Sequence, residues 1–334
     1  MLPVIFGLSG LNLTPNETSF FRVADPTGYI LFARNIESPR QLRSLTDALR
    51  NLSGRVDLPI LIDQEGGRVT RLDPPYWRSW GSATSLSEGT NDLERAARIV
   101  ACNYEALGLE LASVGVTVTC APVLDIPHPG SHKIIGDRAF GTSPDIVSSL
   151  GAACLEGLHM AGIEGVIKHI PGHGRALTDS HENLPRVSAC ESELVEDSEP
   201  FSHLSHAPMA MTAHIVYEAW DPLHCASVSS KIISKQIRSQ IGFEGLLISD
   251  DLSMKALSGS MSSRAVAVLA AGCDIALNCC GKLEDMEEIA DRIPVMTDKT
   301  FERLKRATRN LRPANMSVAL NKRIESLLKM RDQP

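Results

Sequence analysis

The sequence lacks two features that would place the protein at a membrane or on nucleic acid. No apolar run approaches the roughly 18 residues that a membrane-spanning helix needs, so we expect no such helix. Lysine and arginine number 33 against 40 aspartate and glutamate, a net charge of −7 with histidine neutral. Nucleic acid and anionic membranes are bound through cationic surfaces. The composition therefore argues against both as partners.

Paired cysteine motifs and a basic leader are also missing. The eight cysteines include no C-x-x-C pair, the spacing that marks many redox and metal sites. The first basic residue is Arg22, so the positively charged start of a secretory leader is absent. We expect free, mostly buried thiols in a reducing compartment, the cytoplasm.

What the sequence does have is the composition of an ordinary globular protein. Hydrophobic residues make up 43% of its 334 residues and charged residues 22%. No linker or low-complexity boundary divides the chain. We therefore expect a single domain over 1–334, with its main body at about 3–293 and a helical tail at about 298–331.

Short apolar runs recur along the chain and alternate with helical patterns. Leucines at three- and four-residue steps over 42–52, and apolar residues at similar steps over 93–111, are typical of helices with one buried face. Strand-length runs bounded by glycine, proline or polar residues lie at 4–8, 29–32, 59–62, 116–123, 165–167, 209–213, 245–248 and 274–277.

Eight such runs, spaced by nearly 40 residues on average, favour a (β/α)8 barrel, the TIM-barrel form of the α/β class. The alternative is an open, doubly wound sheet. That fold would favour G-x-G-x-x-G after the first strand, and Gly7-Leu8-Ser9-Gly10 does not match it.

Charged residues lie at the ends of three of these runs. Asp63 directly follows the third run, Lys168 and His169 directly follow the fifth, and Asp250 follows the seventh after Ser249. The carboxyl ends of barrel strands meet at one face, where the active sites of this fold are built. Aspartates at such positions also cap the helices that follow. Three coincident clusters favour a functional site.

The densest chemical signal is 168–181, which holds three histidines. His169 and His173 are four residues apart, a spacing that binds metal on a helix. Because Pro171 and two nearby glycines disfavour a helix there, a metal site is the weaker interpretation.

A role in acid–base catalysis requires only two residues of this segment. Asp179 and His181 are two residues apart, so the carboxylate can accept a hydrogen bond from one imidazole nitrogen and raise the basicity of the other. An exposed Asp-x-His also occurs by chance, and the spacing alone does not decide between the two.

Five segments of the chain resemble the signature segments of glycoside hydrolase family 3. The resemblance is strongest to the bacterial cytosolic β-N-acetylglucosaminidases of peptidoglycan recycling, whose branch carries the K-H-x-P-G-H-G and D-x-H combination. Here Ile170 replaces a usual phenylalanine and Ala139 a usual serine. The matching segments are 31–36, 62–69, 168–174, 179–181 and 249–254.

The resemblance implies a TIM barrel that removes a non-reducing terminal N-acetylglucosamine with retention of configuration. Its substrates are muropeptide fragments that end in 1,6-anhydro-N-acetylmuramic acid. It also implies a role for each matching residue. Asp250 is the nucleophile, His181 the acid/base and Asp179 its partner, and the sugar is bound by Asp63, Arg71, Arg138, Lys168 and His169.

This interpretation needs no cofactor and no metal, because hydrolysis of a glycosyl-enzyme needs only water. It predicts a monomer whose partner is a small carbohydrate. Three alternatives stay open: a non-catalytic amino-sugar-binding protein, a metal-dependent hydrolase that uses the histidine-rich segment, and a phosphorylase in which phosphate replaces water.

Overall fold

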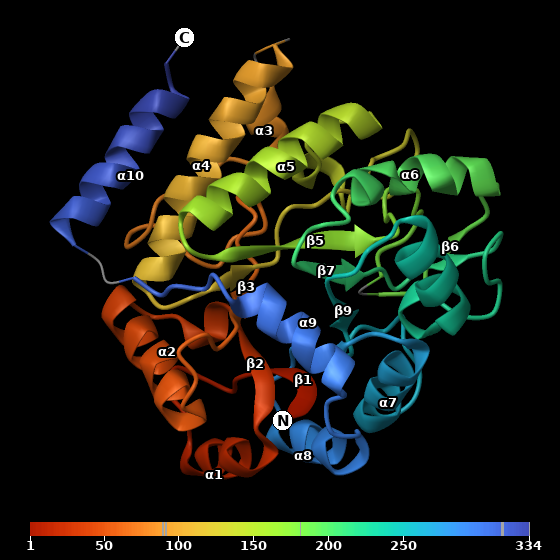
Figure 1. Ribbon diagram of the computed structural model, residues 1–334, viewed down its shortest axis with the longest axis horizontal. Coiled ribbons are helices and arrows are strands. Elements are labelled where there is room, and N and C mark those ends of the chain that lie inside the picture. Colours follow the sequence, from red (N-terminus) through yellow and green to blue (C-terminus); the bar gives the residue numbers. More distant parts are fainter. Residues whose placement is uncertain (89, 91, 181, 315–316, 334) are drawn as a thin grey trace.

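In a computed structural model of the chain, eight parallel strands close into a barrel (Figure 1). The structure describes all residues except 89, 91, 181, 315–316 and 334. The barrel order is β1-β10-β9-β7-β5-β4-β3-β2. These strands are β1 (Leu2–Gly7), β2 (Pro26–Leu31), β3 (Ile60–Ile62), β4 (Val118–Thr119), β5 (Glu164–Ile170), β7 (Met209–Thr212), β9 (Leu246–Asp251) and β10 (Ile275–Asn278).

Each of the eight apolar runs coincides with one barrel strand, which confirms the predicted (β/α)8 fold. The run at 116–123 forms the shortest of these strands, since regular pairing stops after Thr119 and Pro122 has no N–H to donate. A second sheet pairs β6 (Arg186–Val187) with β8 (Val216–Tyr217). Two-residue strands carry no periodicity that sequence reasoning could detect.

Helices surround the barrel (Figure 1). The α-helices are α1 (Pro15–Ala24), α2 (Pro39–Ser53), α3 (Ala83–Ser87), α4 (Leu93–Ser113), α5 (Pro144–Met160), α6 (Glu191–His203), α7 (Met261–Ala271), α8 (Leu283–Arg292), α9 (Asp298–Thr308) and α10 (Val318–Arg331). The other helical segments are the 3-10 helices η1 (Ala33–Asn35), η2 (Gly136–Arg138) and η3 (Ala226–Val228), and the π-helix η4 (Ile232–Gln240). No described helix is long and apolar enough to cross a membrane.

Local sequence explains where these helices begin and end, as α2 illustrates. Ser38 caps its first turn by accepting the N–H of Gln41, and Pro39 occupies the first helical position. Gly54 ends the helix in the left-handed conformation, with φ of 68°. The buried face expected from the leucine spacing is confirmed at Leu42, Leu45 and Leu49.

Apolar side chains of the barrel strands form two clusters, one inside the barrel and one between the strands and the surrounding helices. In β3, Leu61 points into the interior cluster, while its neighbours Ile60 and Ile62 pack outward against the helices. At the amino end of the strands, Leu304 and Ala307 of α9 join the interior cluster together with Leu311. The helix α9 thus closes the amino end of the barrel, and α10 packs along α4 (Figure 1).

Candidate active site

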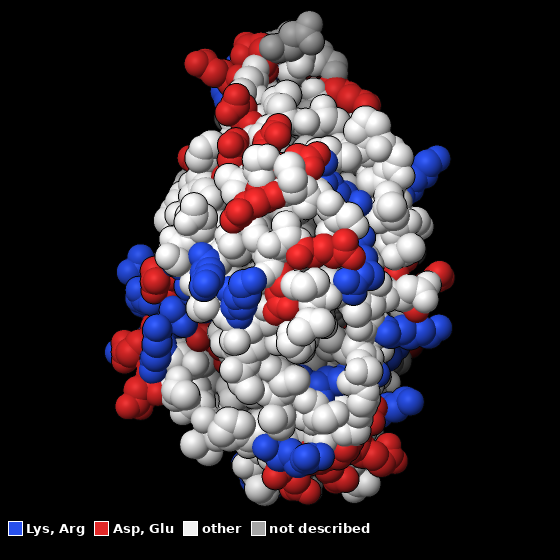
Figure 2. Space-filling model, turned by 90° about the vertical axis from the view of Figure 1, so that its right-hand side faces the viewer, with Lys and Arg blue, Asp and Glu red and all other residues white. Residues whose placement is uncertain are grey.

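The carboxyl end of the barrel carries a cavity of about 280 Å³. Asp63 enters it from the end of β3, Lys168 and His169 from β5, and Asp250 from β9. Figure 2 views the side toward which β5 points in Figure 1, and acidic and basic side chains are interspersed across it. The structure therefore brings together charged residues from the carboxyl ends of three separate strands.

Arg71 and Arg138 also line this cavity, which completes the predicted sugar-binding set. Of the two described residues at 179–180, Ser180 lines the cavity, whereas Asp179 is half-buried beside it in the chain. The predicted acid/base, His181, lies outside the described residues.

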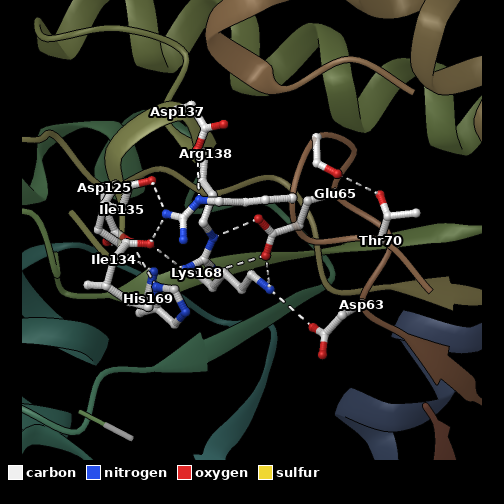
Figure 3. Close-up of polar contacts among 12 residues, drawn as sticks. Asp63, Glu65, Thr70, Asp125, Ile134, Ile135, Asp137, Arg138, Lys168 and His169 are labelled. Carbon is white, nitrogen blue, oxygen red and sulfur yellow. Dashed lines mark hydrogen bonds and ion pairs between the residues drawn. The ribbon is translucent and has the colours of Figure 1, made fainter. Parts of the chain in front are cut away.

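A buried carboxylate, Glu65, organises the cations of the site (Figure 3). Its oxygens lie 2.6 Å from Nζ of Lys168, and they accept from Nε and Nη2 of Arg138 at 2.8 and 2.9 Å. Burial alone would raise the pKa of Glu65, but Lys168 and Arg138 hold it well below its ordinary value. The three groups stay charged at neutral pH.

Asp63 is more accessible than Glu65. Its two oxygens lie 3.3 Å from Nζ of Lys168 and 3.2 Å from Nη2 of Arg71, and its side chain is 20% exposed. Burial would lower the pKa of Lys168, but Glu65 and then Asp63 raise it. A carboxylate at the cavity wall beside two cations can accept from a sugar hydroxyl while the cations donate to others.

A second buried carboxylate, Asp125, holds the two histidines of the K-H-x-P-G-H-G segment. It accepts from Nδ1 of His169 at 2.7 Å and from the backbone N–H of His173 at 2.7 Å. The His173 ring contacts Ser180, with Nε2 and Oγ 3.2 Å apart. Burial lowers the pKa of His173 to about 4, so this ring is neutral at pH 7.

Asp250 and Asp251 both reach the cavity but are held differently. Oδ1 of Asp250 accepts the N–H of Asp251 at 2.8 Å. Oδ1 of Asp251 accepts from the N–H groups of Ser253 and Cys279 at 3.0 Å each, and its Oδ2 accepts from the Ser253 hydroxyl. Three donors tie Asp251 to the barrel wall, which indicates a structural role for it.

Three buried polar residues of this region were not singled out by the sequence reasoning: Glu65, Asp125 and His214. Glu65 lies two residues beyond Asp63, and Asp125 two beyond the fourth apolar run. The rule that found Asp63, a charge directly after a strand, would have found both had it extended two residues further. His214, whose Nε2 lies 3.1 Å from the carbonyl oxygen of Asp251, directly follows the sixth apolar run, 209–213, and was missed although it carries the same signal.

The described residues contain no group of three or more His, Cys, Asp or Glu side chains arranged to hold a metal ion. The rings of His169 and His173, four residues apart, have their centres 5.3 Å apart at 61°. Asp125 holds one ring nitrogen of His169, and the contact with Ser180 occupies one of His173.

Comparison with known proteins identifies the family of the chain. Residues 16–310 match the glycosyl hydrolase family 3 N terminal domain. A beta-hexosaminidase of Alkalilimnicola ehrlichii is 39% identical over 282 residues, which cover 83% of this chain and 80% of the relative.

Two solved structures have the same fold. NagZ from Neisseria gonorrhoeae in complex with N-trifluoroacetyl-D-glucosamine aligns with a TM-score of 0.86 and 28% identity, over 99% of this chain and 98% of NagZ. A family 3 beta-N-acetylglucosaminidase from Paenibacillus aligns with a TM-score of 0.84 and 27% identity, over 98% and 67% of the two chains. The chain therefore belongs to glycosyl hydrolase family 3 and is a glycosidase of the beta-hexosaminidase type.

Proposed function

We propose that the protein is a retaining exo-β-N-acetylglucosaminidase that acts on muropeptide fragments ending in 1,6-anhydro-N-acetylmuramic acid. The observation that carries the proposal is the meeting of Asp250, Asp63 and Lys168 at one cavity of about 280 Å³. This volume is at the small end of ligand sites, which suits one terminal sugar rather than a stretch of polysaccharide. The NagZ complex with an N-acylated glucosamine supports the choice of sugar.

The reaction follows the two-step route of retaining glycosidases. Asp250 attacks the anomeric carbon and forms a glycosyl ester, while the bond to the leaving oxygen breaks and His181 donates a proton to that oxygen. In the second step His181 takes a proton from water, and the oxygen of this water attacks the anomeric carbon and releases Asp250. The enzyme ends in its starting state.

A histidine is a reasonable acid/base for this chemistry. An imidazole has a pKa near 6.5 in water, whereas a carboxylic acid must be buried to reach that value. The residue can therefore work from a segment that is open to solvent. Its role here rests on the sequence resemblance and on Asp179 two residues before it.

The cations and carboxylates of the cavity are proposed to bind the sugar hydroxyls. Asp63 and Glu65 contact Lys168 and engage two of its three N–H donors, so within the described residues one donor is left for a ligand. Arg71, Arg138 and His169 complete the set. A missing hydroxyl would leave a buried group unpaired, which is how such sites discriminate between sugars.

Location and assembly belong to the same proposal. All eight cysteines are free thiols, as is usual in the reducing cytoplasm. We propose a cytoplasmic monomer that binds neither nucleic acid nor membrane and needs no cofactor.

Two measurements test the proposal. The first compares hydrolysis of a chromogenic β-N-acetylglucosaminide with that of the matching β-glucoside, and we expect a strong preference for the former. The second uses a slow fluorosugar substrate followed by mass spectrometry of peptides, and the label should appear on Asp250.

Other outcomes would support other functions. A label on Asp251 would refute the assignment of the nucleophile, and an active enzyme without label would favour attack by the acetamido oxygen of the substrate. Binding without turnover would indicate a sugar-binding protein. Loss of activity with a chelator would favour a metal-dependent hydrolase, and phosphate-dependent release of sugar phosphate a phosphorylase.

A further inference from the structure

Asp125 lies directly behind the cavity wall, and its side chain is completely buried. It receives three hydrogen bonds from one short segment. Oδ1 accepts the backbone N–H groups of His169 and His173, at 3.1 and 2.7 Å, and Oδ2 lies 2.7 Å from Nδ1 of His169. The N–H of Gly172 also donates to the carbonyl of His169, at 2.8 Å. The carboxylate thus holds both ends of a tight turn.

The contact between Asp125 and His169 determines which of the two groups carries the proton between them. Burial would raise the pKa of Asp125, but His169 and His173 lower it below its ordinary value, so the group is ionised. An ionised carboxylate only accepts hydrogen bonds. The proton between the two groups is therefore carried by Nδ1 of His169.

The second ring nitrogen of His169, Nε2, lies on the side of the ring away from Asp125. His169 lines the cavity, and Figure 3 shows its second ring nitrogen on the side away from Asp125. With the proton on Nδ1, Nε2 of the neutral ring carries a lone pair. A hydroxyl group of a ligand can donate to it.

We propose that Asp125 is a positioning residue that holds His169 in the Nδ1–H tautomer, so that Nε2 accepts a hydrogen bond from a hydroxyl of the bound sugar. The inference rests on the proposed function for the contact between His169 and sugar. The tautomer itself is a property of the free enzyme and can be measured without substrate.

Asp125→Asn tests the proposal with almost no change in shape. The amide keeps an oxygen for the two backbone donors, but its NH2 group then faces Nδ1 of His169. Because NH2 only donates, the ring must move its proton to Nε2 to preserve the contact. The group that accepts from the sugar then becomes a donor.

The readout is nitrogen NMR of protein labelled with 15N-histidine at neutral pH, with the His169 signals assigned by their loss in His169→Gln. We expect the Nδ1–H tautomer in the wild type and the Nε2–H tautomer in Asp125→Asn. With a chromogenic substrate, KM of Asp125→Asn should rise about tenfold, the size of one lost hydrogen bond, with a smaller change in kcat.

The matched control is Asp221→Asn. Asp221 accepts from the N–H groups of Leu223 and His224, at 3.0 and 3.3 Å, and lies 3.2 Å from Nδ1 of His224. It resembles Asp125 in these contacts, although it also accepts from the Ser229 hydroxyl at 2.6 Å, and it lies away from the residues that line the cavity, so KM should stay within about twofold of the wild type.

An Nε2–H or doubly protonated His169 in the wild type would overturn the proposal even if Asp125→Asn failed to fold. So would an Nδ1–H ring in a folded Asp125→Asn. A switch of tautomer with unchanged KM would confirm the action of Asp125 on the ring and refute the proposed contact of His169 with the sugar.

Discussion

The two ends of the barrel each contain a cluster of buried charges. At the carboxyl end the central carboxylate and both of its cations line one cavity, whereas at the amino end Arg303 lines a cavity and its carboxylate does not. At the carboxyl end Glu65 binds Lys168 and Arg138. At the amino end Asp274 binds Arg238 and Arg303, at 2.6 and 2.9 Å. Both arrangements pair a carboxylate with two cations, so their charges alone do not distinguish them.

The difference lies in what surrounds each cluster. Asp274 also accepts from the N–H of Leu247 and the hydroxyl of Thr300, and it is only 5% exposed under α9. At the carboxyl end Asp63 shares Lys168 with Glu65 and is 20% exposed at the cavity wall. A buried ion cluster therefore indicates function when its carboxylate and cations line a cavity together, and structure when its carboxylate is enclosed by donors of the protein, as Asp274 is.

The largest expected effect on activity is at the carboxyl end of the barrel. Asp250→Ala removes the proposed nucleophile, and kcat should fall by about 10³-fold or more because the two-step route is lost. Thermal unfolding should change little, since Asp250 forms part of a cavity wall. Steady-state kinetics and a melting curve check both parts. A loss of less than about tenfold in kcat would contradict the assignment.

The second prediction concerns the amino end of the barrel. Asp274→Ala leaves two buried arginines without their shared carboxylate, which should lower the free energy of unfolding by about 3 kcal/mol. Activity per folded molecule should stay near that of the wild type. Chemical denaturation followed by kinetics at a permissive temperature provides the measurement.

The control for this variant is the exposed ion pair between Arg186 and Glu218, in which Glu218 is 38% exposed. Glu218→Ala should lower the free energy of unfolding far less than Asp274→Ala does, because solvent screens an exposed ion pair. If Asp274→Ala were as mild, or reduced kcat as Asp250→Ala does, the distinction between the two ends would fail.

The third prediction concerns the acid/base. His181→Ala should slow substrates with poor leaving groups by about 10²-fold or more, because these need a proton to depart. Activated phenol leaving groups depart without one and should be affected much less. Asp179→Asn should give a milder version of the same pattern. Equal losses across a series of aryl glycosides would instead favour a binding role, and His173 would become the next candidate.

The sequence predicts the barrel well because apolar runs and helical periodicity report directly on burial. It does not predict where α9 packs. The residues 298–331 appear only as a helical tail, whereas Leu304 and Ala307 fill the amino end of the barrel. Where an amphipathic helix docks depends on the shape of the rest of the fold, which no local pattern contains.

The candidate site shows the same division. Asp63, Lys168 and Asp250 are found from sequence since each lies at the end of an apolar run. Glu65 and Asp125 are missed because a charged residue in a loop is usually exposed, and only the packed structure reveals the partners that allow its burial. His173 illustrates the point further, because its spacing from His169 resembles a metal site while its burial makes it a neutral ring.

The smallest expected effect comes from His173 and separates the two ends by their response to acid. The groups around Asp274 are guanidinium, hydroxyl and amide donors, whereas the carboxyl end contains a histidine whose pKa burial has lowered to about 4. In the unfolded chain this pKa returns to about 6.5. Between pH 6.5 and pH 4 the unfolded chain therefore binds a proton that the folded protein does not, and the free energy of unfolding falls as the pH falls.

For one such group the loss between pH 7 and pH 5 is about 2 kcal/mol. Denaturant unfolding of the wild type and of His173→Gln at both pH values measures it. The variant starts less stable at pH 7, since it disturbs a buried contact with Ser180, but its decline on acidification should be about 2 kcal/mol smaller. Parallel declines would show that folding does not lower the pKa of His173, so the acid sensitivity of the barrel would have to be sought elsewhere.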